Sequence, residues 1–152
     1  MHIRHVEKPG TLDEINGITN LMMERIHTLS TDTSEITMHK TVSQALTPGT
    51  RSDFFIAVNS EGTIIGAIFL NRNIGLDHGG EYIWLNELYV RKDHRKQGIA
   101  RKMLMAVVHW AENEGYKAIE LETGMNNEAT KKLYNSLGFY DVISKRYSRA
   151  LC

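Results

Sequence analysis

The sequence predicts an α+β fold in which helices pack against a mixed β-sheet. Two observations predict this class. Helix-like and strand-like segments follow in a mixed order: a pair of helices, a run of consecutive strands, then strand and helix in alternation. The chain of 152 residues is 41% hydrophobic and 24% charged, which suits a folded domain with one core. A single domain over residues 1–152 is therefore expected.

The N-terminal third predicts one short strand and two helices. The strand is expected over residues 1–6. Apolar residues then recur at three- and four-residue spacing from Leu12 to Ile26, which places them on one helical face. Thr11 or Asp13 is suited to cap that helix. A shorter helix is expected from about Ile36 to Leu46, before a proline and a glycine end it.

The middle of the chain predicts three consecutive strands. Phe54 to Val58 and Thr63 to Leu70 are rich in apolar and β-branched residues, and the four residues between them, Asn-Ser-Glu-Gly, have turn chemistry. These two runs predict a hairpin. Tyr82 to Val90 predicts a third strand, and its apolar character indicates burial on both faces.

The second half predicts strand and helix in alternation. A helix is expected over Gly98 to Asn113, with Gly115 as its C-terminal glycine cap. A short strand over Ala118 to Thr123 and a helix over Asn127 to Leu137 follow. Phe139 to Ala150 predicts one or two final strands.

Composition argues against several classes of protein. Lys and Arg together number 18, as do Asp and Glu, so the basic excess of a general nucleic-acid binder is missing and no nucleic-acid partner is expected. The single cysteine is Cys152, and the seven histidines lack i, i+4 pairing, so no metal site is predicted. The chain shows no apolar signal core and no run of about 18 apolar residues. We therefore expect no membrane contact and a cytoplasmic location.

A basic turn leads into the helix that starts at Gly98. The first N–H groups of a helix lack partners and carry partial positive charge, and the small Gly98 and Ala100 allow close approach to the backbone. One interpretation of this turn is a cradle for a pyrophosphate group. A glycine-assisted turn with a solvated basic surface is the other, and these residues alone favour neither. Basic side chains near the turn are Arg91, Lys92, Arg95, Lys96, Arg101 and Lys102.

Two segments carry a resemblance to a known family. Arg95-Lys96-Gln97-Gly98-Ile99-Ala100 resembles the Arg/Gln-x-x-Gly-x-Gly/Ala signature of the GNAT N-acetyltransferase superfamily, and Leu88 to His94 resembles the strand end and turn before it. Asn126 to Phe139 resembles the family segment that runs from an asparagine through alanine and Leu-Tyr to Gly-Phe. Together the motifs cover about residues 84–140, in the family's order.

The resemblance implies a fold and a reaction. The fold is a central mixed, mostly antiparallel, twisted sheet of about six or seven strands, flanked by about four helices. The reaction moves an acetyl group from acetyl-CoA to a primary amine of a small molecule or peptide, by direct attack in a ternary complex and with no metal. Two alternatives stay open: a non-catalytic acyl-CoA sensor on the same fold, and an interaction module whose glycine turn is only a turn.

The resemblance also implies which residues bind the coenzyme. Backbone amides of Gln97, Gly98 and Ala100 would bind the pyrophosphate, and the strand end would pair with the pantetheine arm, which needs an open sheet edge. Asn126 or Asn127 would contact the pantetheine or adenosine side, although a helix N-cap is the alternative. The candidate coenzyme-binding residues are Leu88, Tyr89, Val90, Arg95, Lys96, Gln97, Gly98, Ile99, Ala100, Arg101, Asn126 and Asn127.

Two residues are candidates for catalysis. Tyr134 matches the tyrosine that protonates the departing thiolate in this family, although a core tyrosine is the alternative. Glu87 would take a proton from the amine, and its alternative is an ion pair with a nearby Arg or Lys. His94, Glu122 and His78 are weaker candidates. Because the only cysteine is terminal, an acetyl-cysteine intermediate is not expected.

The sequence does not name the acceptor. In this family the acceptor site is built from segments that correspond to about residues 20–50 and 71–81, which here contain several acidic residues. A cationic amine such as a polyamine, an aminoglycoside or a lysine side chain fits, and an amino acid or a protein N-terminus fits equally. The apolar residues of the final strands indicate a possible homodimer.

Overall fold

The computed structural model describes residues 1–29, 33–123 and 128–151 and divides the chain into two compact units, Met1–Glu122 and Thr123–Cys152. The first unit holds a layered α/β arrangement and the second holds one helix. The predicted α+β class is confirmed. The elements are β1 (His2–His5), α1 (Leu12–Leu29), α2 (Glu35–Ala45), β2 (Ser52–Val58), β3 (Ile64–Gly75), β4 (Gly80–Val90), the 3₁₀ turn η1 (Lys92–His94), α3 (Ile99–Glu114), β5 (Ile119–Leu121) and α4 (Glu128–Ser136).

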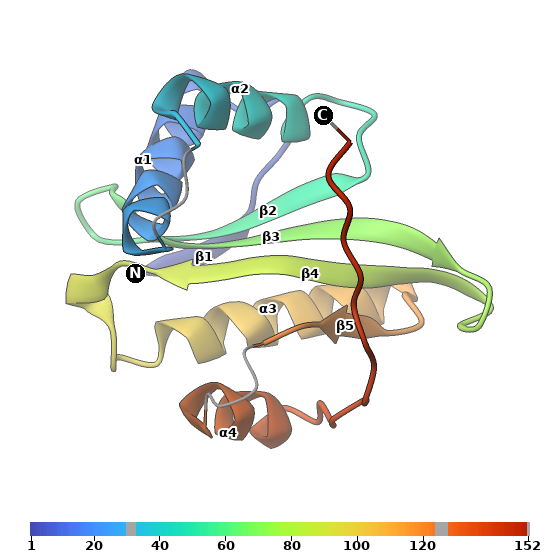
Figure 1. Ribbon diagram of the computed structural model, residues 1–152. Helices are drawn as coiled ribbons and strands as arrows, with labels where there is room; N and C mark the ends of the chain where they lie inside the picture. The colour runs from blue at the N-terminus through green and yellow to red at the C-terminus, as the bar shows by residue number, and fades with distance from the viewer. Residues whose placement is uncertain (30–32, 124–127, 152) are drawn as a thin grey trace. The chain divides into compact units, whose positions relative to one another are not determined.

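The first unit is built on a five-stranded sheet in the order β1-β2-β3-β4-β5. Neighbours from β1 to β4 are antiparallel, and β5 lies parallel to β4, as a mixed and mostly antiparallel sheet requires. The helices α1 and α2 cover one face of the sheet and α3 covers the other (Figure 1). The unit is therefore a three-layer sandwich of helix, sheet and helix.

Each face of the sheet has its own packed layer. On the α1 face, Ile18, Leu21 and Ile56 are at most 1% exposed, and on the α3 face Met103 and Val107 are fully buried. The start of α1 is a capping box, because the Thr11 hydroxyl accepts from the Glu14 N–H at 3.1 Å while the Glu14 carboxylate accepts from the Thr11 N–H at 2.8 Å. Thr11, one of the two predicted caps, therefore fixes where this helix begins.

Two expectations about strands need correction. The predicted final strands over 139–150 are wrong, since residues 139–151 have no strand in the described part of the chain, and the sheet has five strands instead of six or seven. Residues such as Val142 and Ile143 favour strands, but a strand forms only where a neighbour supplies the hydrogen-bond ladder. β4 is not buried on both faces throughout, because Asn86 is exposed and Glu87 is half-buried.

The second unit is described by itself. Its helix α4 ends at Ser136 and is followed by Gly138, whose φ of 89° suits glycine, and the Phe139 N–H donates to the Tyr134 carbonyl at 3.1 Å. The Tyr134 and Phe139 rings meet edge to face with centroids 5.6 Å apart. Across the described residues of both units, no helix is both long and apolar enough to span a bilayer.

Candidate active site

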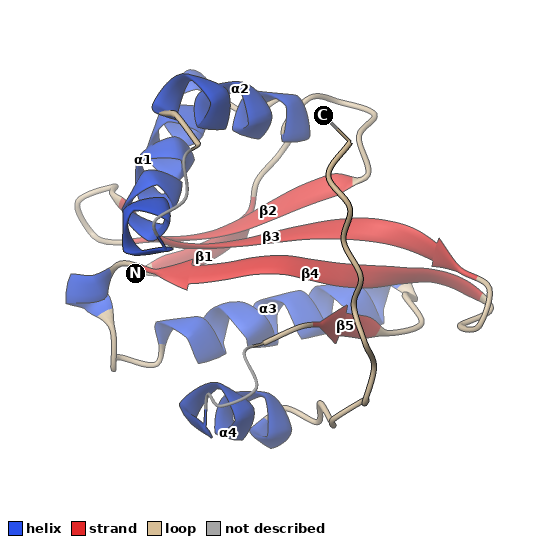
Figure 2. Cartoon of the chain, in the orientation of Figure 1, coloured by secondary structure: helices blue, strands red, loops and turns tan. Residues whose placement is uncertain are grey.

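A β-bulge interrupts β4 halfway along its length. Phe69 of β3 pairs with Glu87, but the next residue, Leu70, pairs with Leu85, so Asn86 is the extra residue. On the other side, β5 pairs only with Ile83 to Leu85. Figure 2 shows β5 as a short strand beside β4. Within the described chain, no strand pairs with residues 86–90 along this edge, so the second half of β4 is an open edge.

The hydrogen-bond pattern shows which backbone groups this open edge presents. The Arg91 N–H donates to the Ile65 carbonyl of β3 at 2.9 Å. Because the backbone groups of a strand alternate between its two sides, Glu87 and Tyr89 bond towards β3, while Leu88 and Val90 present theirs to the open edge. The Val90 carbonyl accepts from Arg95 Nε at 3.1 Å. Leu88 and Val90 are thus the residues of β4 whose backbone is placed to pair with an extended ligand.

The glycine turn follows directly after this edge. Gly98 is the N-cap of α3 with a left-handed φ of 76°, and it makes no side-chain cap. A Cβ built on Gly98 would meet nothing within 4 Å, so this position needs glycine for its backbone angle and leaves open space beside the helix start. Lys96, with φ 63°, is the one non-glycine residue of the described chain at positive φ. The predicted turn is present, and the first N–H groups of α3 point out of it.

The basic residues of the turn divide into two groups. Arg95 lies over the Tyr89 ring, with its guanidinium carbon 5.2 Å from the ring centroid, and Arg91 Nε donates to the Ile64 carbonyl at 3.2 Å. Both guanidinium groups are therefore held against the sheet. Lys92, Lys96 and Lys102 are exposed and give the helix start a positive surface.

Glu87 and Tyr89 face α1 on the same side of β4. Glu87 forms an ion pair with Arg25, so the alternative interpretation of Glu87 as an ion-pair partner is realised in the structure. The Tyr89 hydroxyl donates to Glu24 Oε2 at 2.8 Å. Burial raises the pKa of Glu87, and the charge and hydrogen bond of Arg25 oppose that rise only in part. A half-buried carboxylate with a raised pKa is a suitable proton acceptor for an amine.

Sequence reasoning missed the partnership between α1 and β4. In the sequence, Glu24 is only one of several acidic residues in the segments expected to build the acceptor site, and no pattern singles out Arg25. No local signal would have found them, since Glu24 and Tyr89 are 65 positions apart in the chain and their contact depends on how the helix packs. The pattern of apolar residues in α1 fixes which face is buried but not which strand residues its polar rim contacts.

The remaining candidate residues for catalysis and coenzyme binding lie in other parts of the chain. Tyr134 lies in α4 of the second unit, so its role beside Glu87 stays a prediction. Asn126 and Asn127 lie outside the described residues. His94 contacts Asp93 at 2.7 Å and His78 contacts Glu120 at 3.0 Å, so each of these weaker candidates pairs with a carboxylate.

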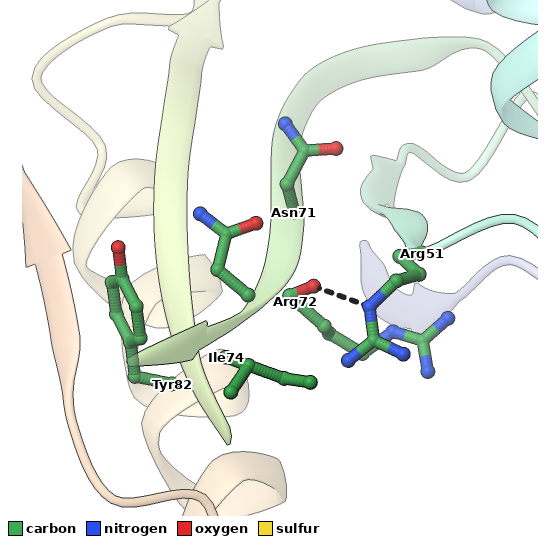
Figure 3. A pocket seen from close by; sticks show the side chains of 6 residues that line it. Arg51, Asn71, Arg72, Ile74 and Tyr82 are labelled. Atoms are coloured by element: carbon green, nitrogen blue, oxygen red, sulfur yellow. Dashed lines mark hydrogen bonds between the residues drawn. The ribbon is translucent and has the colours of Figure 1, made fainter. Parts of the chain in front are cut away.

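Two surface hollows of the first unit lie away from the glycine turn. Figure 3 shows the first, on the β3–β4 hairpin, which is lined by Tyr82 and by Arg51 and Arg72, and in which Arg51 Nε donates to the Arg72 carbonyl at 2.8 Å. The second surrounds the buried Asp53 and includes Trp110 of α3. Neither hollow includes residues of the predicted coenzyme site. That site is an open edge and an exposed turn, which an extended ligand would cover along its length.

The second hollow contains a dense charge network. Asp53, 5% exposed, contacts His5 Nε2 at 2.9 Å, Lys8 Nζ at 3.6 Å and Arg72 Nε at 2.8 Å. The Arg72 contact is close enough for an ion pair, although its geometry is not that of a hydrogen bond. Burial alone would raise the pKa of Asp53, but the His5 hydrogen bond and the charges of Lys8 and Arg72 lower it below its usual value. Among the described residues, no group of three or more His, Cys, Asp or Glu side chains is arranged to hold a metal ion.

Comparison with protein families identifies one match. The model of the acetyltransferase (GNAT) family matches residues 22–139. Human N-acetyltransferase 8 is 30% identical over 114 residues, which cover 74% of this chain and 46% of that protein. N-alpha-acetyltransferase 30 of Schizosaccharomyces pombe is 33% identical over 87 residues, which cover 56% of this chain and 55% of that protein. The matched part is thus about half the length of these relatives.

Solved structures show the same fold. The crystal structure of a probable acetyltransferase superposes with a TM-score of 0.86 at 19% identity, covering 100% of this chain and 99% of the other. An aminoglycoside N-acetyltransferase solved in complex with CoA superposes with a TM-score of 0.78 at 19% identity, covering 99% of this chain and 95% of the other. At these identities the likeness establishes the fold.

Proposed function

Because the chain belongs to the acetyltransferase (GNAT) family, we propose that it transfers an acetyl group from acetyl-CoA to a primary amine of a small molecule or peptide. The observation that carries the proposal is the open second half of β4, which runs directly into the left-handed glycine start of α3. An extended ligand that ends in a pyrophosphate needs these two features in this order.

In this proposal the coenzyme lies along the edge and the turn. The pantetheine amides pair with the backbone of Leu88 and Val90. The pyrophosphate accepts from the N–H groups of the signature segment Arg95 to Ala100, close to the exposed Lys96 and the adjacent Arg101. Asn126 and Asn127 are included among the proposed coenzyme-binding residues on the basis of the family motif alone.

The proposed reaction is a direct transfer. The amine nitrogen attacks the thioester carbonyl, the new C–N bond forms and the C–S bond breaks. Glu87, directly or through a water, takes the proton that the amine loses, and its raised pKa suits that task. Tyr134 is proposed to give a proton to the departing thiolate, because a phenol with a pKa near 10 can protonate a developing thiolate. A sensor that only binds acyl-CoA would need neither group.

The acceptor is proposed as an amine of a small molecule or of a peptide. The names of the relatives support both classes, since they include an N-alpha-acetyltransferase and an aminoglycoside N(6')-acetyltransferase type 1 of Salmonella typhimurium, 26% identical over 103 residues. A panel of peptides and aminoglycosides, with detection of the released thiol, would separate them. The cytoplasmic location stays a prediction, which fractionation of the source cells would test.

A homodimer is also proposed. In the second unit, several large hydrophobic side chains that follow α4 are each at least two-thirds exposed, and a second copy of the chain would cover them. Sedimentation equilibrium at micromolar concentration should give twice the monomer mass of 17.3 kDa, and a monomer would overturn this proposal. The side chains are Tyr140, Val142, Ile143, Tyr147 and Leu151.

The first test is the melting temperature of the protein with and without acetyl-CoA. A ligand that binds only the native state adds about 2.7 kcal/mol of stability at 100 times its dissociation constant, which raises the melting temperature by about 5–10 °C in a chain of this size. ATP and NAD serve as ligand controls. A folded protein whose melting temperature does not respond to acetyl-CoA would overturn the proposal.

The two ends of α3 offer a matched pair of variants. Gly98 and Gly115 have φ angles of 76° and 81°, and a Cβ at either position would meet nothing within 4 Å. Gly98→Ala and Gly115→Ala should therefore lose similar stability, about 1–2 kcal/mol each. Only Gly98→Ala should also weaken acetyl-CoA binding, by about tenfold, because it disturbs the helix start that binds the phosphates. Equal affinity in the two variants would contradict a pyrophosphate site at Gly98.

A further inference from the structure

The carboxylate of Glu87 has two unlike oxygens. Arg25 Nε contacts Oε1, and within the described chain Arg25 is the ion-pair partner of this carboxylate, while Oε2 carries no described hydrogen bond. The Glu87 side chain is 24% exposed and the Arg25 side chain 29% exposed, so the pair is partly screened from water. One oxygen is therefore held in place, and the other can accept a proton.

Arg25 is in position because its neighbour Glu24 ties α1 to the end of β4. Glu24 Oε2 accepts from the Tyr89 hydroxyl at 2.8 Å and from the Lys92 N–H at 3.3 Å, and Glu24 Oε1 lies 3.6 Å from Arg91 Nη1. Successive residues of a helix point about 100° apart. Glu24 and Arg25 consequently contact different residues of one strand, Tyr89 and Glu87, which lie two positions apart on the same face.

The charge of Arg25 opposes the effect of burial on the ionisation of Glu87. Burial favours the protonated carboxyl group, and a carboxyl group that already holds its proton cannot accept one from an amine. Phe69, directly opposite on β3, is uncharged, and Glu24, the acidic residue beside Arg25 on α1, is bound to Tyr89, Lys92 and Arg91. The guanidinium of Arg25 is thus the cation that counters burial.

We propose that Arg25 is a positioning residue for acetyl transfer: it fixes one oxygen of Glu87 and keeps the carboxylate ionised, so that the other oxygen can take the proton of the attacking amine. This inference rests on the proposed function. It adds a residue of α1, outside both sequence motifs, to the machinery of the reaction. Arg25 itself touches neither the amine nor the thioester and acts only through Glu87.

Substitutions of Arg25 separate its charge from its geometry. In Arg25→Gln the charge is lost, so the acid limb of the kcat/KM profile for acetyl transfer should move to higher pH by about 1 unit, the lower end of the range for an adjacent opposite charge. The rate should recover towards that of the wild type above this limb. Arg25→Lys keeps a charge without the guanidinium fork, so its acid limb should stay close to the wild-type position while kcat falls.

Arg51→Gln is the matched control. It removes another Arg–Glu pair of the first unit, in which Arg51 Nη2 lies 2.9 Å from Glu81 Oε1 near the opposite end of β4. Its pH profile should match that of the wild type. Melting temperatures of the variants, measured at one pH, establish that each is folded before its rates are compared.

A second readout does not depend on activity. The carboxyl carbon of Glu87, assigned in an isotope-labelled protein by comparison with Glu87→Gln, can be titrated by NMR. Its midpoint should be higher in Arg25→Gln than in the wild type. If Arg25→Gln lowers the rate at every pH and leaves both the acid limb and the Glu87 midpoint unchanged, Arg25 only packs α1 and the inference is overturned. If the wild type transfers acetyl to no amine, the proposed function is overturned, whatever the NMR titration shows.

Discussion

Glu87 and Asp53 are both partly or wholly buried carboxylates on one sheet, yet their pKa values move in opposite directions. Among the described residues Glu87 has one cationic partner, Arg25, and its pKa is raised by burial. Asp53 contacts His5, Lys8 and Arg72, and its pKa is lowered. Burial acts on both in the same sense, so the number of partners decides the outcome.

The difference separates a group that can react from a group that holds the fold. A carboxylate with several cations around it gives up its proton readily and does not take it back, so it is a poor base. A buried carboxylate with one cationic partner keeps a higher pKa and accepts a proton more readily. Asp53 lies opposite Leu70 and Glu87 opposite Phe69, so the two faces of the sheet use the same chemical group for different purposes. Variants of the two residues should therefore show different defects.

The largest expected effect is on turnover in Glu87→Gln. Loss of a general base typically lowers the rate by about 10²–10⁴-fold. Stability should change little or rise slightly, because the buried charge is removed while the amide can still accept from Arg25. Steady-state kinetics with thiol detection, alongside the melting temperature, checks both. A variant that keeps full kcat would show that water or another group takes the proton.

Asp53→Asn should show the reverse pattern. Removing the anion leaves the nearby cations without their counter-charge, which costs about 3 kcal/mol for a buried network and lowers the melting temperature by roughly 6–12 °C. Turnover per folded molecule should be unchanged at a temperature where the variant is native. A clear loss of kcat in fully folded protein would break the division of purposes between Asp53 and Glu87.

Acid titration of stability should also distinguish the two groups. Because the pKa of Asp53 is lowered by folding, its contribution is fully present above its unfolded value near 3.8 and is lost as pH falls through the lower folded pKa. The raised pKa of Glu87 works in the other sense: its carboxylate lowers stability as pH rises from the unfolded value of 4.5 through the folded one. Urea unfolding from pH 3 to 7 in the wild type, Asp53→Asn and Glu87→Gln would measure each slope. Identical slopes in all three would contradict both assignments.

The smallest effect is expected for Lys8→Met. Lys8 Nζ lies 3.6 Å from Asp53 and donates to the Thr50 carbonyl at 3.2 Å, but His5 and Arg72 remain when it is removed. A loss of about 1 kcal/mol in the free energy of unfolding is therefore expected, with no change in turnover. Chemical denaturation checks this. A loss as large as that of Asp53→Asn would show that the three partners of Asp53 are not interchangeable.

The parts of the fold that the sequence predicts are those governed by local patterning. The apolar spacing predicted α1, and turn and cap chemistry predicted the β2–β3 hairpin and Gly115 at the end of α3, each confirmed within a few residues. The prediction of final strands over residues 139–150 was wrong because a strand depends on a neighbouring strand that no local pattern reveals. At the site, the glycine turn was predictable from residue types, but the contact of Arg25 with Glu87 depends on the packing of α1 on β4.

The single extra residue in β4 reverses the phase of the strand. Before the bulge, odd-numbered residues such as Ile83 and Leu85 share the face of Leu70, which α3 covers; after it, odd-numbered residues such as Glu87 share the face of Phe69, which α1 covers. One insertion therefore lets a strand keep apolar residues in the core along its first half and turn a carboxylate towards the other layer in its second. If Asn86 instead took its turn in a regular strand, Asn86 would lie opposite Phe69 and Glu87 would point to the α3 face, so the direction of this carboxylate depends on the bulge as much as on the residue's identity.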